Sequence, residues 1–412
     1  MNTRCGLVGE HLSHSYSPRI HALLEDYPYA LIEVPREELA DFFARRDFKA
    51  VNVTIPYKEL VIPLLDTVSD LARRIGSVNT VVQDAQGRLH GYNTDAYGFT
   101  EMVRRAGIPV SGRKCLVLGS GGASKTACAC LHQLNAGEVV VISRKGLDNY
   151  TNLYRHADAQ VIVNATPVGM YPNNGKTLLH LADFPRLEGV LDLIHNPAKT
   201  ALLLEAERLG IPCANGMYML AAQAKRASEL FFDRMLPDVS IDGMCARITQ
   251  DTMNVVLIGL PGTGKSTVGR LLAQKMARPF LDTDDMIRER TGLTCADYLR
   301  AHGEEAFRVL ETEAVAEAGK RCACVIATGG GVVTREKNRD LLRQNGVIFE
   351  LQRPLNQLEM GDHPLSPTPE ALAELAAHRA PCYAAFRDEA VPACEPAAAA
   401  EEVLLRFNAR FS

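Results

Sequence analysis

The chain has 412 residues and a formal net charge of −4, from 45 basic and 49 acidic side chains. Hydrophobic residues make up 47% and charged residues 23% of the sequence, which is typical of a globular protein and excludes disordered, collagen-like and fibrous classes. At roughly 150 residues per domain, two or three domains are expected. The balanced charge gives no basic surface for nucleic acid, and no apolar run reaches the roughly 18 residues of a membrane span. We therefore expect neither nucleic acid nor a membrane as a partner.

The first residues, MNTRCGLVGE, have the pattern of a strand and not that of a secretory signal. The eleven cysteines are spread through apolar stretches without CxxC spacing, so we interpret them as free thiols of a reducing compartment. Together these features predict a cytoplasmic protein.

Strand-like runs alternate with helical patterns along the chain, which favours an α/β fold with mainly parallel sheets. Three of these runs, at 114–118, 254–258 and 324–327, are each followed at once by a glycine-rich turn and a helical pattern. Weak periodicity and turn residues after residue 236 indicate a boundary near residue 250. We expect a catalytic lobe formed by 1–102 and 215–240, a Rossmann-like lobe at 103–214, a linker at 241–252 and a further domain at 253–412.

Polar residues gather in four short segments of the first lobe, SHSYSP, NVTIPYK, SVNT and GYNTD. The residues of interest in them are Ser15, Ser17, Thr54, Lys58, Asn79 and Asp95. Hydroxyls on a turn suit a small carboxylate, and a lysine beside a carboxylate can deliver the proton that a ketone needs when hydride reduces it. Each segment taken alone is also explained by a serine-rich turn or a solvated lysine, so it is their convergence that favours a site.

A glycine-rich turn, GSGGASK, follows the run at 114–118 and precedes a helical pattern. Such a turn lets backbone N–H groups approach a dinucleotide at the start of a helix. We therefore expect cofactor binding by Gly119, Ser120, Gly121, Gly122 and Ala123. The next strand, VVVIS, ends at Ser143 and is followed by Arg144. An arginine at this place suits a ribose 2′-phosphate, which favours NADP(H) over NAD.

The segment at 259–266, GLPGTGKS, fits the phosphate-binding pattern GxxxxGK[ST] in full and lies between a strand and a helical pattern. Its backbone N–H groups would surround phosphate oxygens, Lys265 would reach the β- and γ-phosphates of ATP, and Ser266 would ligate Mg²⁺. The residues that we expect at the nucleotide are Gly262, Thr263, Gly264, Lys265, Ser266 and Thr267.

The acceptor side of this domain is indicated by acidic, basic and glycine residues further along. Asp282 and Asp284 stand two apart after an apolar run, where an extended backbone would turn both carboxylates to one side; a helix cap is the alternative interpretation. Arg308 and Glu311 have the i,i+3 spacing of one helical face, either as a buried pair that orients the guanidinium or as a surface pair. The ATGGG segment brings three glycines to the end of a strand, where backbone can approach a ligand.

The first 240 residues resemble shikimate dehydrogenases in the segments SHSYSP, NVTIPYK, SVNT, GYNTD, GSGGASK, NATPVGM and GMYMLAAQA, in that family's order. The resemblance implies a two-lobed dehydrogenase fold in which Lys58 and Asp95 are the catalytic pair. It implies that the substrate is bound by Ser15, Ser17, Thr54, Asn79, Asp95 and Gln223. It further implies NADP(H) binding by 119–123, Ser143 and Arg144, with Asp70, Leu193 and Gly216 near the nicotinamide. His195 stands where this family has a substrate-facing tyrosine, and its ring can still form a hydrogen bond.

Residues 253–412 resemble shikimate kinases in LIGLPGTGKSTVGRLLA, LDTD, GEEAFRVLE, ATGGG and HRAPCY. The resemblance implies a P-loop kinase of the nucleoside-monophosphate-kinase-like type with a parallel sheet. It implies that Asp282 serves Mg²⁺, that Asp284 binds the shikimate hydroxyls, and that Arg308, Gly330 and Arg379 hold shikimate with both arginines on its carboxylate. His363 stands in place of an arginine of the lid, and Arg353 is the other candidate for that charge.

We therefore expect a bifunctional enzyme of aromatic amino-acid biosynthesis. It would reduce 3-dehydroshikimate to shikimate with NADPH and then phosphorylate shikimate with ATP, so that its partners are small molecules. Two alternatives remain at this point: a quinate/shikimate dehydrogenase that uses NAD, fused to a kinase for another small acid, and a C-terminal nucleotide-binding module that regulates without turnover.

Overall fold

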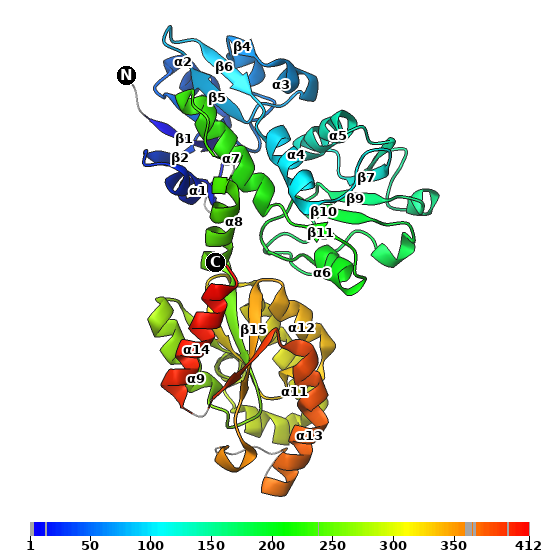
Figure 1. Cartoon of the computed structure of the whole chain (residues 1–412), viewed down its shortest axis with the longest axis vertical. Coiled ribbons are helices and arrows are strands. Elements are labelled where there is room, and N and C mark those ends of the chain that lie inside the picture. Colours follow the sequence, from blue (N-terminus) through cyan, green and yellow to red (C-terminus); the bar gives the residue numbers. More distant parts are fainter. Residues whose placement is uncertain are drawn as a thin grey trace. The chain divides into compact units, whose positions relative to one another are not determined.

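The structure is a computed structural model that describes residues 4–12, 15–237, 239–358, 365, 368–393 and 395–411, with the backbone alone at 239 and 240. The chain divides into two compact units. The first comprises Met1–Met170, Lys176–His195 and Leu202–Ile248, and the second comprises Tyr171–Gly175, Asn196–Ala201 and Thr249–Ser412. Each unit is described by itself below (Figure 1).

The first lobe of the first unit contains a six-stranded sheet in the order β2-β1-β3-β5-β6-β4. The strands are β1 (Cys5–Gly9), β2 (Tyr29–Glu33), β3 (Ala50–Val53), β4 (Thr67–Val68), β5 (Thr80–Gln83) and β6 (Leu89–Tyr92). Strand β1 pairs in parallel with β2 and β3, whereas β5 runs antiparallel to β3 and to β6. Strand β4 also pairs in parallel with β6, so three of the five pairings are parallel, as expected, and the few residues between β5 and β6 can join only antiparallel strands.

Short helices connect these strands: α1 (Ser17–Leu24), η1 (Arg36–Glu38), α2 (Leu39–Arg45), η2 (Ile62–Leu64) and α3 (Asp70–Ile75). A core of aromatic and branched aliphatic side chains, among them Phe42, Phe43, Phe48 and Tyr57, lies between the sheet and α2. Three of the polar segments singled out in the sequence lie at the ends of β1, β3 and β6, and SVNT leads into β5, so all four border strands of this sheet.

The second lobe holds a fully parallel sheet in the order β11-β10-β9-β7-β8. Its strands are β7 (Lys114–Leu118), β8 (Glu138–Ile142), β9 (Val161–Asn164), β10 (Gly189–Asp192) and β11 (Cys213–Ala214), and the helices around it are α4 (Asp95–Ala106), α5 (Gly122–Gln133), η3 (Leu153–His156), η4 (Leu181–Asp183) and α6 (Ala201–Arg208). Alternate residues of β7 pack to opposite sides: Cys115 and Val117 lie in a core with α4 and α5, and Leu116 and Leu118 in a core with α6.

Two helices, α7 (Met217–Phe232) and α8 (Val239–Thr252), follow this sheet. Ile241, Met244 and Ile248 of α8 are buried in a cluster with Ile20 of α1 and Met217 of α7. The expected linker at 241–252 is thus a packed helix. Its apolar residues form only a narrow stripe, and packing against other helices stabilises such a segment where intrinsic periodicity is weak.

The second unit has a parallel five-stranded sheet in the order β13-β14-β12-β15-β16. Its strands are β12 (Asn254–Ile258), β13 (Phe280–Asp282), β14 (Val325–Ala327), β15 (Gly346–Gln352) and β16 (Glu389–Pro392). Its helices are α9 (Lys265–Met276), α10 (Thr283–Thr291), α11 (Cys295–Lys320), η5 (Val332–Thr334), α12 (Glu336–Arg343), η6 (Leu355–Gln357), α13 (Pro369–Phe386) and α14 (Pro396–Ala409).

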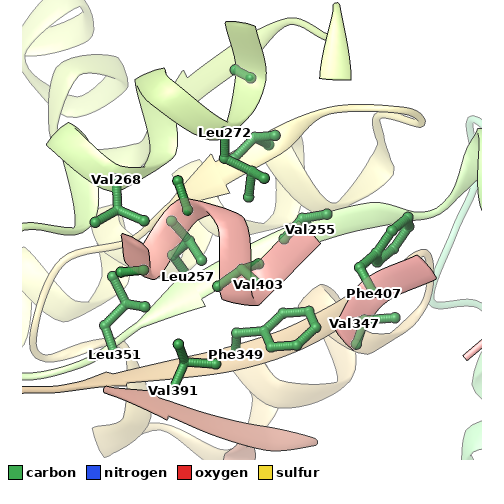
Figure 2. Close-up of a cluster of buried hydrophobic side chains, with 14 of the residues drawn as sticks. Val255, Leu257, Val268, Leu272, Val347, Phe349, Leu351, Val391, Val403 and Phe407 are labelled. Carbon is green, nitrogen blue, oxygen red and sulfur yellow. The ribbon is translucent and has the colours of Figure 1, made fainter. Parts of the chain in front are cut away.

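Helices cover both faces of this sheet, α9 and α14 on one side and α11, α12 and α13 on the other (Figure 1). Figure 2 shows the first side, where Val255 and Leu257 of β12 meet Val268 and Leu272 of α9 and Phe407 of α14. Because both faces are buried, the four residues of β12 that follow Asn254 are all apolar.

Within the described part of the chain, none of the helices combines the length and apolar character needed to cross a lipid bilayer. The ten cysteines described are all unpaired thiols, and each is buried or partly buried.

Candidate functional sites

The first unit pairs a lysine and an aspartate that are 37 residues apart in the sequence. Lys58 follows β3, and Asp95 is the first residue of α4. The Nζ atom of Lys58 donates to Oδ2 of Asp95 at 2.7 Å, and the two side chains are 26% and 14% exposed. The carbonyl of Lys58 also accepts from the backbone N–H of Val78, which fixes the lysine loop against the segment that precedes β5. The pair is therefore rigid but reachable from solvent.

A buried amide network lies beside this pair and is centred on Asn79. Its Nδ2 donates to Oγ1 of Thr94 at 3.0 Å and to Oε1 of Gln223 at 3.5 Å, and its Oδ1 accepts from the backbone N–H of Thr94 at 2.7 Å. Asn52, on β3, donates to the carbonyl of Asn79 at 3.2 Å and accepts from the hydroxyl of Tyr29 at 2.7 Å. Buried polar groups linked in this way hold one another in a fixed orientation.

These groups line one cavity of about 590 Å³. The predicted site residues that the structure brings together there are Ser15, Ser17, Thr54, Lys58, Asn79, Asp95, Ala123, Leu193, His195, Gly216 and Gln223. Sequence reasoning missed Asn52, although it opens the segment NVTIPYK, and it also missed Tyr16 and Met219 on the wall of the cavity.

His195 closes one side of this cavity. Its ring makes an edge contact with Tyr16 at a centroid distance of 5.5 Å. Burial lowers the pKa of His195 to about 4, so the ring is neutral near pH 7 and offers one donor and one acceptor nitrogen. A neutral ring with both functions can replace a tyrosine hydroxyl as a hydrogen-bonding group.

The glycine-rich turn at 119–122 connects β7 with α5. Gly119 has φ of +104°, and a Cβ atom there would lie 2.9 Å from Thr166 and 3.0 Å from the carbonyl of Ala165, so only glycine fits. At Gly121, which caps α5, a Cβ atom would meet no atom within 4 Å among the described residues. The turn therefore exposes the helix N-terminus to open space, which fits the pyrophosphate of a dinucleotide.

The remaining predicted cofactor residues lie apart from the cavity. Ser143 and Arg144 directly follow β8, and Arg144 is exposed. Asp70, at the start of α3, has a side chain that is 91% exposed and pairs with Arg73 at 3.3 Å. The structure does not bring Asp70 to the cavity wall, since its side chain points to solvent at the surface of α3.

In the second unit, the loop at 259–266 wraps around the amino group of its own lysine. Lys265 is the first residue of α9, and its Nζ donates to the carbonyls of Gly259 and Leu260 at 2.9 Å each. Gly262 and Gly264 have φ of +76° and +84°, which lets the intervening N–H groups turn inward. Burial lowers the pKa of Lys265, and the negative charges of Asp284 and Asp282 partly offset this decrease. The loop has the curvature and charge that phosphate groups require.

Beside the loop, the Ser266 hydroxyl donates to Oδ2 of Asp282 at 2.6 Å. Two hard oxygen atoms thus converge next to the phosphate loop, and Mg²⁺ prefers one or two such ligands together with phosphates and water. The described ranges hold no group of three or more His, Cys, Asp and Glu side chains that could bind a metal by themselves. Thr267 of the same turn is exposed.

The expectation that Asp282 and Asp284 share an extended backbone is wrong. Asp282 ends β13 and caps α10 by accepting from the N–H of Asp284 at 3.0 Å, and α10 begins at Thr283. Helix α10 starts directly after Asp282, so the backbone between the two aspartates is not extended. The helix cap and the metal role are therefore both compatible with Asp282.

Asp284 and Glu311 face each other across Gly329. Burial, followed by the charges of Asp282 and Glu311, raises the pKa of Asp284. Oδ1 of Asp284 and Oε1 of Glu311 have no hydrogen-bond partner within the described part of the chain. A Cβ atom on Gly329 would lie 2.8 Å from the first and 3.0 Å from the second. The gap between these two acceptors is suited to a hydroxyl donor.

Arg308 and Arg379 complete a cavity of about 110 Å³ that Asp284, Glu311 and Gly330 also line. Arg308 is only 5% exposed, and its Nη1 donates to Oε2 of Glu311 at 2.8 Å, so the surface-pair interpretation is wrong. Arg379 is equally buried and donates to the carbonyl of Gly330 at 3.0 Å. Two buried arginines beside an apolar surface suit a carboxylated ring.

The apolar wall of this cavity was missed by sequence reasoning: Cys295, Ala296, Leu299 and Phe307 lie on α11. Their helical spacing is that of an ordinary core face, so no local signal distinguishes them. His363, singled out in the lid, lies outside the described residues. Arg353 is partly buried and directly follows β15.

Comparison with known proteins identifies both units. The family model of the shikimate dehydrogenase substrate binding domain matches residues 7–81, and the shikimate kinase model matches residues 261–406. A shikimate dehydrogenase (NADP(+)) of Clostridium perfringens (strain SM101 / Type A) is 34% identical over 248 residues, which span 55% of this chain and 91% of that protein.

Solved structures agree with this similarity. The shikimate 5-dehydrogenase from Thermus thermophilus, in complex with NADP(H) and shikimate, is 34% identical with a TM-score of 0.54, over 59% of this chain and 98% of its own. A quinate dehydrogenase from Corynebacterium glutamicum, in complex with NAD, is 27% identical with a TM-score of 0.55, over 60% of this chain and 98% of its own.

Proposed function

Because this chain belongs to the shikimate dehydrogenase family and also carries a shikimate kinase domain, we propose that it catalyses two consecutive reactions. The first unit reduces 3-dehydroshikimate to shikimate, and the second phosphorylates shikimate to shikimate 3-phosphate. The observation that supports this most directly is that each unit has its own cavity with polar groups for one small acid, a lysine–aspartate pair in one and two arginines beside a phosphate loop in the other.

In the reductase, Lys58 and Asp95 act on the carbonyl oxygen. NADPH supplies the hydride for the carbonyl carbon, and the ammonium group of Lys58 is the proton donor to the oxygen. Asp95 holds that group in place through its 2.7 Å hydrogen bond. Ser15, Ser17 and Thr54 bind the polar substituents of the ring, and Asn79 and Gln223, already linked to each other, hold it against the lysine.

NADP(H) selectivity is assigned to the end of β8. Ser143 and Arg144 follow this strand, where the ribose of a dinucleotide lies in Rossmann-like sheets. The exposed guanidinium of Arg144 can meet a 2′-phosphate from solvent. Gly119–Ala123 carry the pyrophosphate, and Leu193 and Gly216 lie near the nicotinamide. Asp70, which points to solvent, has no part in this proposal.

In the kinase, Lys265 leaves its two carbonyl partners for the β- and γ-phosphates of ATP, and the loop from Gly262 to Thr267 supplies N–H groups to the same phosphates. Mg²⁺, held through Ser266 and Asp282, neutralises charge on the phosphates. Asp284 accepts the hydrogen of the 3-hydroxyl and orients its oxygen toward the γ-phosphate. Arg308 and Arg379, with the backbone of Gly330, fix the opposite end of the ring through its carboxylate.

We also propose that both reactions take place in the cytoplasm. The ten described cysteines are all free thiols, as is typical of proteins in a reducing compartment.

Separate substitutions test the assignment of the two units. Lys58→Ala is expected to lower shikimate-dependent NADP⁺ reduction by about 10²–10⁴-fold, the usual contribution of a general acid, while ADP formation from added shikimate is retained. Lys265→Ala is expected to do the reverse. Lys275→Ala, at the far end of α9 and paired with Glu401 at 2.8 Å, is the matched lysine control and leaves both activities intact.

Three outcomes would contradict the proposal, and the last two of them would favour the alternatives. Loss of both activities in either variant, with the fold retained, contradicts independent sites. ATP binding by the wild-type chain without shikimate-dependent ADP release indicates a regulatory nucleotide-binding module. A preference for quinate and NAD over shikimate and NADP⁺, measured at matched concentrations, indicates a quinate/shikimate dehydrogenase.

A further inference from the structure

A carboxylate of the chain itself lies against the arginine that is proposed to bind the carboxylate of shikimate. Oε1 of Glu304 accepts from Nε of Arg308 at 3.2 Å and from Nη2 at 3.0 Å. The same charge also acts on Arg379: burial lowers the pKa of Arg379, and the Glu304 carboxylate is among the groups that oppose this effect. Glu304 is therefore in direct contact with Arg308, and its charge also acts on Arg379.

Arg308 has a second acidic partner, Glu311, whose situation is different. Glu311 is fully buried, with its Oε2 on Nη1 of Arg308 at 2.8 Å, so it cannot leave without an uncompensated buried charge. The side chain of Glu304 is 51% exposed. It directly follows Gly303, whose φ of 83° and ψ of 167° interrupt α11. Glu304 can rotate into water at little cost, and Glu311 cannot.

The donors of Arg308 are largely occupied by these two residues. A guanidinium has five N–H groups, and a carboxylate that is bound in bidentate geometry needs two parallel N–H groups. Glu311 uses one on Nη1, and Glu304 uses Nε and one on Nη2. A substrate carboxylate that enters this cavity thus meets a guanidinium whose N–H donors are partly occupied, and it meets the negative charge of Glu304 next to them.

We propose that Glu304 is a displaceable stand-in for the substrate carboxylate: it neutralises Arg308 in the empty kinase site, leaves when shikimate binds, and thereby sets the affinity of the kinase for its acid substrate. This inference rests on the proposed function of the second unit. Glu311 keeps Arg308 in position during the exchange, so that the guanidinium is not left without an acidic partner.

The substitution Glu304→Gln tests this. It keeps the size of the side chain but removes the charge that competes for Arg308. The KM for shikimate is expected to fall about two- to fivefold, the range that partly exposed ion pairs allow, with a smaller change in kcat and in the KM for ATP. The methyl ester of shikimate, which has no carboxylate charge, is expected to be phosphorylated with the same KM by the variant and the wild type.

Glu305→Gln is the matched control, because Glu305 is 86% exposed, pairs with Arg335 and changes the net charge equally. It should leave the KM for shikimate unchanged. A higher KM in Glu304→Gln would overturn the proposal, since Glu304 would then orient Arg308 for the substrate. An equal decrease in both variants would overturn it as well, because the effect would be one of overall charge. If the wild-type chain itself phosphorylates no shikimate, the proposed function fails instead.

Discussion

Among the described residues, Oδ1 of Asp284 and Oε1 of Glu311 have no hydrogen-bond partner, and the gap between these two oxygens makes a sharp prediction for Gly329→Ala. Gly329 follows β14, and alanine adds no backbone strain there because the φ of this residue lies outside the left-handed region. The added methyl group, however, would stand 2.8 Å from Oδ1 of Asp284 and 3.0 Å from Oε1 of Glu311. It would fill the space in which we place the reacting hydroxyl.

The size of the effect follows from these distances. Ordinary van der Waals contact begins at 3.4 Å, so the Asp284 carboxylate has to move by about 0.6 Å and that of Glu311 by about 0.4 Å. A misplacement of about 1 Å can cost 10²-fold in rate, so a shift of this size predicts a decrease in kcat of roughly tenfold. The KM for ATP should change little, since the phosphate loop is not touched by the new methyl group.

The assay is steady-state ADP release with shikimate, measured beside NADP⁺ reduction by the same preparation. Reductase activity reports the amount of intact chain, and an unchanged KM for ATP reports that the kinase unit is folded. Gly243→Ala, in α8, is the control, because a Cβ atom there meets nothing within 4 Å among the described residues. A kcat within twofold of the wild type for Gly329→Ala would refute the placement of the hydroxyl between these carboxylates.

Two further predictions concern stability. His21 is fully buried and stacked on Tyr29 at a centroid distance of 3.8 Å, and burial lowers its pKa to about 3. Its unfolded pKa is near 6.5, so the unfolded chain binds the extra proton, and stability is lost as pH falls from about 6.5 toward 3, by up to about 5 kcal/mol. The free energy of unfolding of the first unit, measured with urea between pH 7 and 4, should depend less steeply on pH in His21→Phe than in the wild type. If the two plots of free energy against pH were parallel, the prediction would be wrong. In the second unit, Phe407→Ala removes a fully buried ring from the cluster of Figure 2 and should cost about 3–5 kcal/mol. In this variant, kinase activity should be lost at a lower temperature than reductase activity. Equal inactivation temperatures would be evidence against this loss of stability.

The elements that sequence reasoning predicted best are those in which a local pattern and the tertiary environment agree. Strand β12 is apolar because both of its faces are covered, and the phosphate loop that follows it needs glycine for its own backbone conformation. Both signals lie within a dozen residues. Helix α8 shows the opposite case, since its stability comes from contacts with α1 and α7 that no local pattern contains.

The same distinction applies to the sites. Lys58 and Asp95 lie at strand and helix ends, where polar residues after an apolar run attract attention. Asn52 was missed because it lies within a strand, and its role depends on Tyr29 and Asn79 from two other strands or loops. Cys295 and Leu299 were missed because one face of a helix has the same spacing whether it packs on a core or on a ligand. Long-range geometry decides these roles.

The two cavities solve the same recognition problem with different electrostatics. In the reductase, the charge of Lys58 is matched by Asp95 at 2.7 Å, and we propose that the acid is bound there through hydroxyls and amides. In the kinase, Arg308 and Arg379 are buried, and the product gains a phosphate group beside Lys265. Asp284 and Glu311 line the same cavity as the two arginines, so the kinase site presents buried charge pairs and not a large net positive charge. The two proposed sites thus differ in how they would hold one acid, mainly through hydroxyl and amide groups in the first cavity and through buried guanidinium groups in the second.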